Sequence, residues 1–202
     1  VRLWPASFAN FAAFRSDRLL LPILASTQDL GIYLVIGTLI DVAMGPTEAA
    51  ANVLTPRWRT AWLGGHLRSR RVFAMAIAYL LVVGLVMVSV GQAVIEFAAG
   101  HAYRPSTGLV VLLTASGALF GFNRILVARV TVTGAASTVS AAETAGMIVA
   151  VVGYLTLIPS MGASGAALGS LLGYGTTTVL AAAAWANQAH QLGRSEQRDQ
   201  KR

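Results

Sequence analysis

The segment Val72–Val90, VFAMAIAYLLVVGLVMVSV, decides the fold of this chain because it contains no charged residue. An α-helix rises about 1.5 Å per residue, so a run of this length crosses a hydrocarbon core of about 30 Å. A segment inside a bilayer must satisfy its backbone polar groups internally, which a helix does. We therefore predict a transmembrane helix here.

The composition of the whole chain agrees with a membrane protein. Of its 202 residues, 55% are hydrophobic and 11% are charged, whereas a soluble domain of this size needs more charge to cover its surface. The net charge of +7 does not indicate a nucleic-acid partner, because the basic residues lie between apolar runs. The absence of cysteine and the wide spacing of the histidines predict no metal site and no cofactor.

We expect an all-α polytopic membrane protein. Apolar runs separated by polar breaks predict six transmembrane helices, over residues 3–25, 31–55, 72–98, 106–130, 139–158 and 163–187. Residues 188–202 are rich in polar and charged residues and are predicted to form a disordered cytoplasmic tail. Tryptophans near the predicted cytoplasmic span ends suggest an aromatic belt, formed by Trp4, Trp58, Trp62 and Trp185.

Basic residues outside the spans gather on one side of the predicted membrane. That side holds Arg57, Arg59, Arg68, Arg70, Arg71, Arg129, Arg194, Arg198, Lys201 and Arg202. On the opposite side the sequence has only Arg104. The positive-inside rule then predicts that both termini are cytoplasmic, which six spans satisfy. The arginines between the second and third spans are expected to fix the topology and to contact anionic membrane lipids.

Ionisable side chains within the first span are candidate site residues, because such groups are unfavourable in hydrocarbon and usually face a bundle interior or a wet cavity. Arg15 and Arg18 are three residues apart and share one helix face, with Asp17 beside it. These two arginines could offer positive charge to a phosphate or another anion.

The second span carries a polar stripe. Asp41, Glu48 and Asn52 are separated by seven and four residues, so they fall on one side of a helix. Pro46 should kink this helix and free a backbone carbonyl. We interpret the polar residues of spans one and two as the lining of a substrate cavity. Two alternatives stay open, namely that Arg18 only pairs with Asp41 between helices, or that 15–18 lies at the membrane interface.

Asn123 and Arg124 in the fourth span are secondary candidates for the cavity. Arg124 is close enough to the end of its span to reach the headgroups, and this simpler reading is favoured. Glu143 is expected at the interface. Small residues at the start of the sixth span, Gly162, Gly165, Gly169 and Gly173, predict close helix packing within the bundle. No sequence pattern of soluble catalysis is present, so we do not expect an enzyme.

Several motifs, taken in order, resemble one family. Arg15-Ser-Asp17-Arg18-Leu-Leu-Leu followed by Gln28-Asp-Leu-Gly31-Ile-Tyr33 is similar to its R-x-D-x-x-L … L-G-x-Y pattern. Ile158-Pro159-Ser-Met-Gly162-Ala-Ser-Gly165-Ala-Ala is similar to its I-P-x-Y-G-x-x-G-A-A pattern, with Met161 in place of the aromatic residue. Weaker matches are Leu54-Thr-Pro56-Arg57, His101-Ala-Tyr103 and Gly121-Phe-Asn123-Arg124. The chain thus resembles the polysaccharide-biosynthesis flippases of the multidrug/oligosaccharidyl-lipid/polysaccharide exporter superfamily.

The resemblance implies a fold and a function. Members carry two pseudo-symmetric six-helix halves around a central cavity, and this chain, which begins with Val1, resembles the C-terminal half. The implied activity is flipping of an undecaprenyl-diphosphate-linked oligosaccharide across the bacterial cytoplasmic membrane by alternating access. Arg15 and Arg18 would meet the diphosphate. The implied partners are the lipid-linked glycan, membrane lipids, a missing N-terminal half and a coupling ion.

Three other readings remain open at this point. A drug or cation exporter of the same superfamily would favour an acidic cavity. A membrane-embedded glycan polymerase or glycosyltransferase would favour a large polar outer loop, and the predicted outer breaks are short. A half without its partner could also act only as a membrane scaffold.

Overall fold

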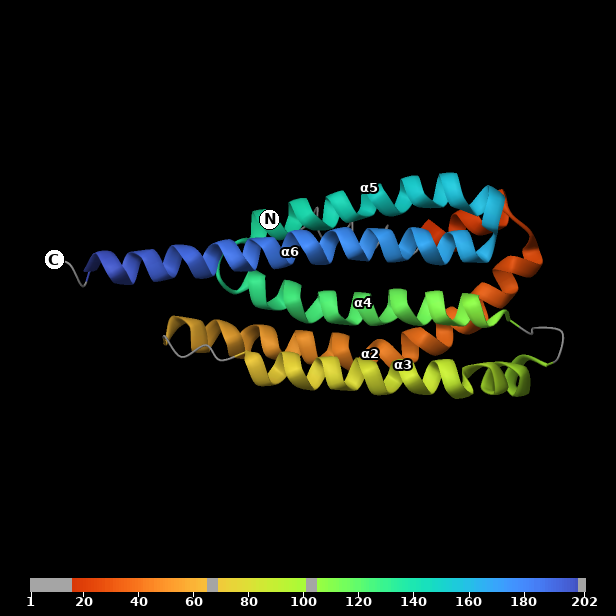
Figure 1. Cartoon of the computed structure of the whole chain (residues 1–202), viewed down its shortest axis with the longest axis horizontal. Helices are drawn as coiled ribbons and strands as arrows, with labels where there is room; N and C mark the ends of the chain where they lie inside the picture. Colours follow the sequence, from red (N-terminus) through yellow and green to blue (C-terminus); the bar gives the residue numbers. More distant parts are fainter. Residues whose placement is uncertain (1–15, 65–68, 101–104, 200–202) are drawn as a thin grey trace.

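The computed structural model describes residues 16–64, 69–100 and 105–199, with side chains except at 98–99 and 189–199. A short helix over residues 16–24 precedes five long helices, which are α2 (Thr27–Leu63), α3 (Arg70–Ala99), α4 (Thr107–Thr131), α5 (Ala136–Met161) and α6 (Ala163–Asp199). The long helices run along the longest axis of the molecule (Figure 1). The described residues contain no strand.

These five helices confirm the predicted fold class. Each is long and apolar enough to cross a membrane. Large apolar side chains also point outward, and on α3 the exposed fractions reach 69% at Leu85 and 94% at Phe97. A water-soluble surface does not carry so continuous an apolar face. The protein is an all-α polytopic membrane protein. Of the expected first span, residues 3–15 lie outside the described part and residues 16–24 are helical.

The helix boundaries differ most from the predicted spans at both ends of α2 and at the end of α6, and α2 continues to Leu63, past the predicted end at residue 55. α2 begins at Thr27, because the Ser26 hydroxyl accepts a hydrogen bond of 3.0 Å from the Asp29 backbone N–H and caps the helix. Residues 27–30 are therefore the start of α2, with Ser26 as its N-cap, rather than a break. At the other end of the chain, α6 continues to Asp199, so a disordered tail from residue 188 onward was wrong for 188–199. Ala, Gln, Arg and Glu are strong helix formers and extend a helix that the membrane span has already nucleated.

Within the described residues, the helix ends that were predicted to share one side of the membrane share one end of the bundle. Figure 1 shows the C-terminal ends of α2, α4 and α6 together with the N-terminal ends of α3 and α5. The described basic residues Arg57, Arg59, Arg70, Arg71 and Arg129 therefore lie toward this end, which we call the basic end. Its placement in the cytoplasm remains a prediction.

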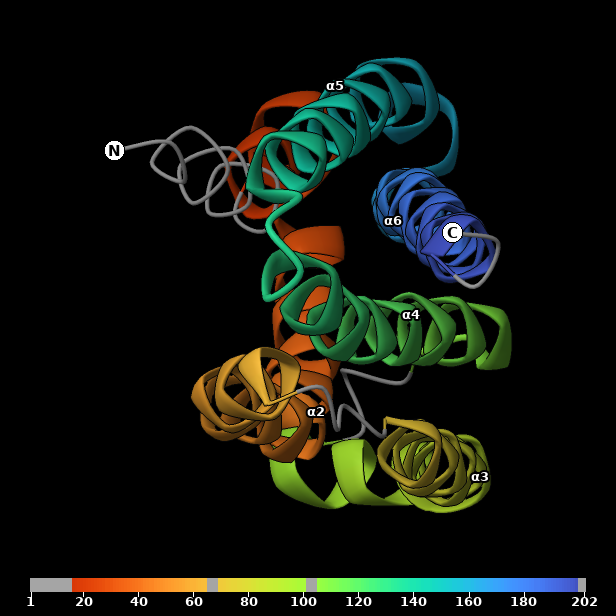
Figure 2. The same cartoon turned by 90° about the vertical axis from the view of Figure 1, so that its left-hand side faces the viewer.

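Helix α4 is the centre of the bundle. Viewed along the bundle, it lies between α5 and α6 on one side and α2 and α3 on the other (Figure 2). Two glycines of α4 allow the close approach of α2. A Cβ atom on Gly117 would collide with Ile40, and one on Gly121 would lie 2.8 Å from Thr47 Oγ1. The polar side chains of α2 are thereby brought against α4.

Helices α5 and α6 pack through glycine, as the spacing predicted. A Cβ atom on Gly165 would collide with the Leu157 carbonyl, and Gly169 lies against the Tyr154 ring. The Tyr154 hydroxyl and Ser170 Oγ are 2.9 Å apart across the same interface. The regularly spaced glycines of α6 therefore serve helix packing within this chain.

Helix α2 changes direction along its length, as Pro46 predicted (Figure 1). Carbonyls of the turn before Pro46 receive donors from side chains. Tyr79 of α3 donates to the Ala43 carbonyl at 2.5 Å, and Thr47 donates to the Met44 carbonyl at 2.7 Å. The Tyr79 hydrogen bond fastens α3 to the turn of α2 that precedes Pro46.

An aromatic cluster holds the basic end together. Phe73 of α3 stacks on Trp58 of α2, with ring centroids 6.2 Å apart, and on Trp185 of α6, at 5.2 Å. Trp58 is only 4% exposed, so it packs between helices and does not belong to an interfacial belt. Trp4 lies outside the described residues.

Candidate functional site

A half-open cavity of about 200 Å³ lies among the helix over 16–24, α2, α4 and α6. Its polar lining consists of Asp17, Arg18, Tyr33, Asp41, Glu48, Ser116, Ser170 and Tyr174. Its apolar lining includes Ile40, Met44 and Phe120. A cavity with ionisable walls inside a set of membrane-spanning helices is the strongest functional feature of the described part.

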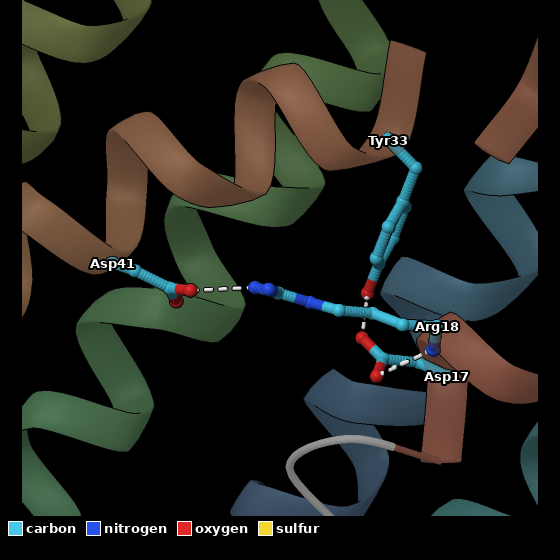
Figure 3. Close-up of polar contacts among 4 residues, drawn as sticks. All are labelled: Asp17, Arg18, Tyr33 and Asp41. Carbon is cyan, nitrogen blue, oxygen red and sulfur yellow. Dashed lines mark hydrogen bonds and ion pairs between the residues drawn. The ribbon is translucent and has the colours of Figure 1, made fainter. Parts of the chain in front are cut away.

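Two polar contacts join the helix over 16–24 to α2, and Figure 3 shows both. The Arg18 guanidinium reaches across the cavity and donates through Nη2 to Asp41 Oδ2 at 2.5 Å. The Tyr33 hydroxyl donates to Asp17 Oδ2 at 2.5 Å. Asp17 Oδ1 also accepts from the Arg18 backbone N–H at 2.8 Å. The two carboxylates therefore fix the position of the arginine at both its backbone and its side chain.

The Arg18–Asp41 ion pair is accessible from the cavity. The side chains are 20% and 34% exposed, respectively. Gly37, one turn before Asp41, leaves room for the guanidinium, because a Cβ there would lie 3.6 Å from Arg18 Nη2. Arg18 Nε is buried and has no hydrogen-bond partner among the described atoms. The arginine thus has donor capacity beyond the ion pair.

Glu48, which lines the cavity, also belongs to a second group of charged side chains around Arg124. Arg124 of α4 lies between two carboxylates, with Nη2 3.8 Å from Glu48 Oε1 and Nη1 3.8 Å from Glu143 Oε1. Its guanidinium also lies over the Phe120 ring, 5.9 Å from the centroid. Arg124 therefore links α2 to α5 inside the bundle, and the expectation that it extends to the headgroups was wrong. Glu143, at 6% exposed, is buried and not interfacial.

Asn123 occupies a small pocket between α4, α5 and α6 with Glu143 and Thr177. It is 1% exposed, and its Oδ1 atom has no hydrogen-bond partner among the described atoms. Asn123 is adjacent to the charged cavity but does not line it.

The structure brings together most of the residues that the sequence singled out. Asp17, Arg18, Asp41 and Glu48 line one cavity. Asn52 is exposed and does not line it, so its inclusion in the stripe was wrong. Asn52 lies one helical turn beyond Glu48, and the lining of the cavity on α2 ends at Glu48. Arg15 lies outside the described residues.

Sequence reasoning missed two kinds of site residue. The hydroxyl groups of Tyr33, Ser170 and Tyr174 carry no pattern that separates them from ordinary polar residues in membrane helices. Glu143 did have a signal. Arg124 and Glu143 lie at about the same distance in sequence from the connection between α4 and α5, and an antiparallel helix pair places such residues at the same depth.

The charges that line the cavity are mostly acidic in the described part. Asp17, Asp41 and Glu48 face a single cation, Arg18. No group of three or more metal-ligating side chains occurs within the described ranges. Charged walls and a half-open form are suited to binding a charged solute or headgroup.

Comparison of the chain with protein-family models, with curated proteins and with solved structures found no match. The fold and the cavity together define the class of this protein. The chain is a polytopic helical membrane protein with a charged cavity between its spans.

Proposed function

We propose that this protein is a membrane transporter, and that its charged cavity binds the anionic headgroup of a lipid-linked glycan for transfer across a bacterial cytoplasmic membrane. The observation that carries this proposal is the accessible Arg18–Asp41 ion pair inside a set of membrane-spanning helices. Buried charge is retained in membrane helices chiefly where it is used. The substrate class rests on the sequence resemblance.

The ion pair suggests how an anion would be bound and released. A diphosphate is a better bidentate partner for a guanidinium than a single carboxylate oxygen. Entry of the headgroup would draw Arg18 from Asp41, and Asp41 would recover the arginine after release. Tyr33 and Asp17 would hold the Arg18 backbone in place during this exchange.

The cavity is half open, and we propose that a second helical lobe closes it in the working transporter. Alternating access then comes from rocking of the two lobes. The 202-residue chain alone is expected not to restore glycan export in a flippase-null bacterium, and co-expression with its partner lobe is expected to restore it. Restoration by the chain alone would contradict the two-lobe proposal.

Headgroup binding is tested directly on the full chain in detergent. Undecaprenyl diphosphate is expected to remain bound in native mass spectrometry, and undecaprenol, which lacks the charge, is not. Arg18→Ala should weaken binding of the diphosphate by about tenfold or more, since charge-assisted hydrogen bonds are lost. Arg59→Ala, an exposed arginine of α2 outside the cavity, and Asn52→Ala are matched controls that should bind normally. Equal binding of both lipids, or no effect of Arg18→Ala, would reject the proposal.

A second candidate function is export of organic cations, and the acidic excess in the described cavity lining favours it. Ethidium efflux from cells that express both lobes would then depend on Asp41 and Glu48. In that case Asp41→Asn would reduce ethidium efflux, and Arg18→Ala would leave undecaprenyl diphosphate binding unchanged.

A further inference from the structure

A second cavity lies between α2 and α3, on the far side of the Pro46 bend from the ion pair. Its volume is about 340 Å³, and its walls are almost entirely apolar. The walls that matter here are Ala50, Val53 and Leu54 of α2, Val72 and Met75 of α3, and Ile125 of α4. An apolar groove of this size between membrane-spanning helices is open to hydrocarbon chains.

Each of the two helices that form the groove, α2 and α3, carries an arginine on its groove face at the basic end. On α2, Arg57 follows Val53 by four residues and Ala50 by seven, so it lies on the same helix face. On α3, Arg71 precedes Met75 by four residues and therefore lies on the groove face as well. The groove thus has an apolar interior and a basic mouth.

Contacts between the two helices place both arginines at one level. Trp58 directly follows Arg57, and Phe73 is two residues after Arg71. The rings of Trp58 and Phe73 stack with their centroids 6.2 Å apart. The two rings are 4% and 8% exposed, so this part of the mouth is a packed frame. Arg57 and Arg71 themselves are exposed, and neither forms an ion pair with a described side chain.

We propose that this groove binds an anionic phospholipid, with one acyl chain between α2 and α3 and the phosphate between Arg57 and Arg71. A guanidinium pairs with a phosphate through two parallel hydrogen bonds, and two of them can neutralise a single headgroup. The charge of the mouth selects an anionic lipid over a zwitterionic one. This inference does not depend on the proposed transport function.

The bound chain would also contact the bend of α2. Tyr79 lines the groove and donates to the Ala43 carbonyl in the turn that Pro46 opens. Pro46 and Thr47 line the groove as well. An acyl chain in the groove would therefore support the bent form of α2 that carries Asp41 and Glu48.

Lipid retention tests the proposal on the full chain. The protein is reconstituted in nanodiscs that contain equal amounts of dioleoylphosphatidylglycerol and dioleoylphosphatidylcholine, which share their acyl chains and differ in charge. After transfer to detergent, native mass spectrometry should show retained phosphatidylglycerol and little phosphatidylcholine. Glycerol phosphate, a headgroup without chains, should not displace the lipid.

The decisive comparison uses two variants of equal net charge. Arg57→Gln/Arg71→Gln should lower phosphatidylglycerol retention about tenfold. Arg59→Gln/Arg70→Gln removes two arginines at the same end but off the groove faces, and should change retention less than about twofold. Ala50→Phe, and independently Met75→Trp, should fill the groove and lower retention while the unfolding temperature of the protein stays close to that of the wild type.

Three results would overturn the proposal. Equal loss of phosphatidylglycerol retention in the two double-arginine variants would mean that the basic end attracts lipid only through its overall positive charge. Unchanged retention in both groove-filling variants would mean that no acyl chain enters the groove. Displacement by glycerol phosphate would identify the mouth as a site for free phosphate esters.

Discussion

The charged side chains of the cavity are positioned by partners that are distant in sequence. Arg18 is 23 residues from Asp41, yet their side chains form the ion pair that spans the cavity. Asp17 is 16 residues from Tyr33 and accepts its hydroxyl. Both contacts join the same two helices, so the position of Arg18 depends on how the helix over 16–24 folds back against α2.

A double-mutant cycle measures the ion pair. Arg18→Met and Asp41→Leu should each destabilise the protein in detergent, and the pair should show a favourable coupling of about 1 kcal/mol. This is smaller than for a fully buried pair, because both side chains are partly exposed. Urea unfolding followed by tryptophan fluorescence gives the free energies. A control cycle of Arg18→Met with Asn52→Leu should show no coupling. Equal couplings in both cycles would contradict the structure.

Proline shapes α2, and glycine shapes the contact between α5 and α6. Pro46 bends α2, and Tyr79 and Thr47 donate to carbonyls of the turn that precedes it. Glycine brings α5 and α6 into contact so close that backbone lies against backbone, as at Gly153 and Gly169. These residues decide which side chains of neighbouring helices can meet.

Glycine substitutions test the α5–α6 interface. Gly165→Ala should destabilise the protein by about 1–3 kcal/mol, because the new Cβ would collide with the Leu157 backbone carbonyl, which cannot move aside. Gly108→Ala is the control, since nothing lies within 4 Å of its Cβ position in the first turn of α4. It should raise stability slightly, by up to about 1 kcal/mol, because alanine favours helix. Thermal unfolding in detergent measures the stability of both variants. Equal unfolding temperatures of Gly165→Ala and Gly108→Ala would contradict the close packing of α5 on α6.

At the scale of the whole molecule, the described residues form a basic end and an opposite end with little positive charge. The C-terminal ends of α2, α4 and α6 lie together with the N-terminal ends of α3 and α5 at the basic end. The positive-inside rule therefore predicts that the whole basic end faces the cytoplasm. The groove mouth with Arg57 and Arg71 belongs to this end. The leaflet with the most anionic lipid would then meet the most basic surface of the protein.

Cysteine labelling tests this orientation, and the absence of native cysteine makes it clean. Ser137 and Ser160 are exposed and lie near opposite ends of α5. In intact cells, an impermeant maleimide should label Ser160→Cys and should label Ser137→Cys only after the membrane is made permeable. The reverse pattern would place the basic end outside the cell.

The sequence by itself determined the all-α polytopic class, since long uncharged runs have no other stable state in hydrocarbon. It also determined the basic end and the bend at Pro46, because these depend on composition and on one residue. It could not determine that Asn52 leaves the cavity, that Arg124 lies between Glu48 and Glu143, or that an apolar groove ends at Arg57 and Arg71. Those features depend on the rotation and tilt of helices against their neighbours, which only the packing of distant side chains decides.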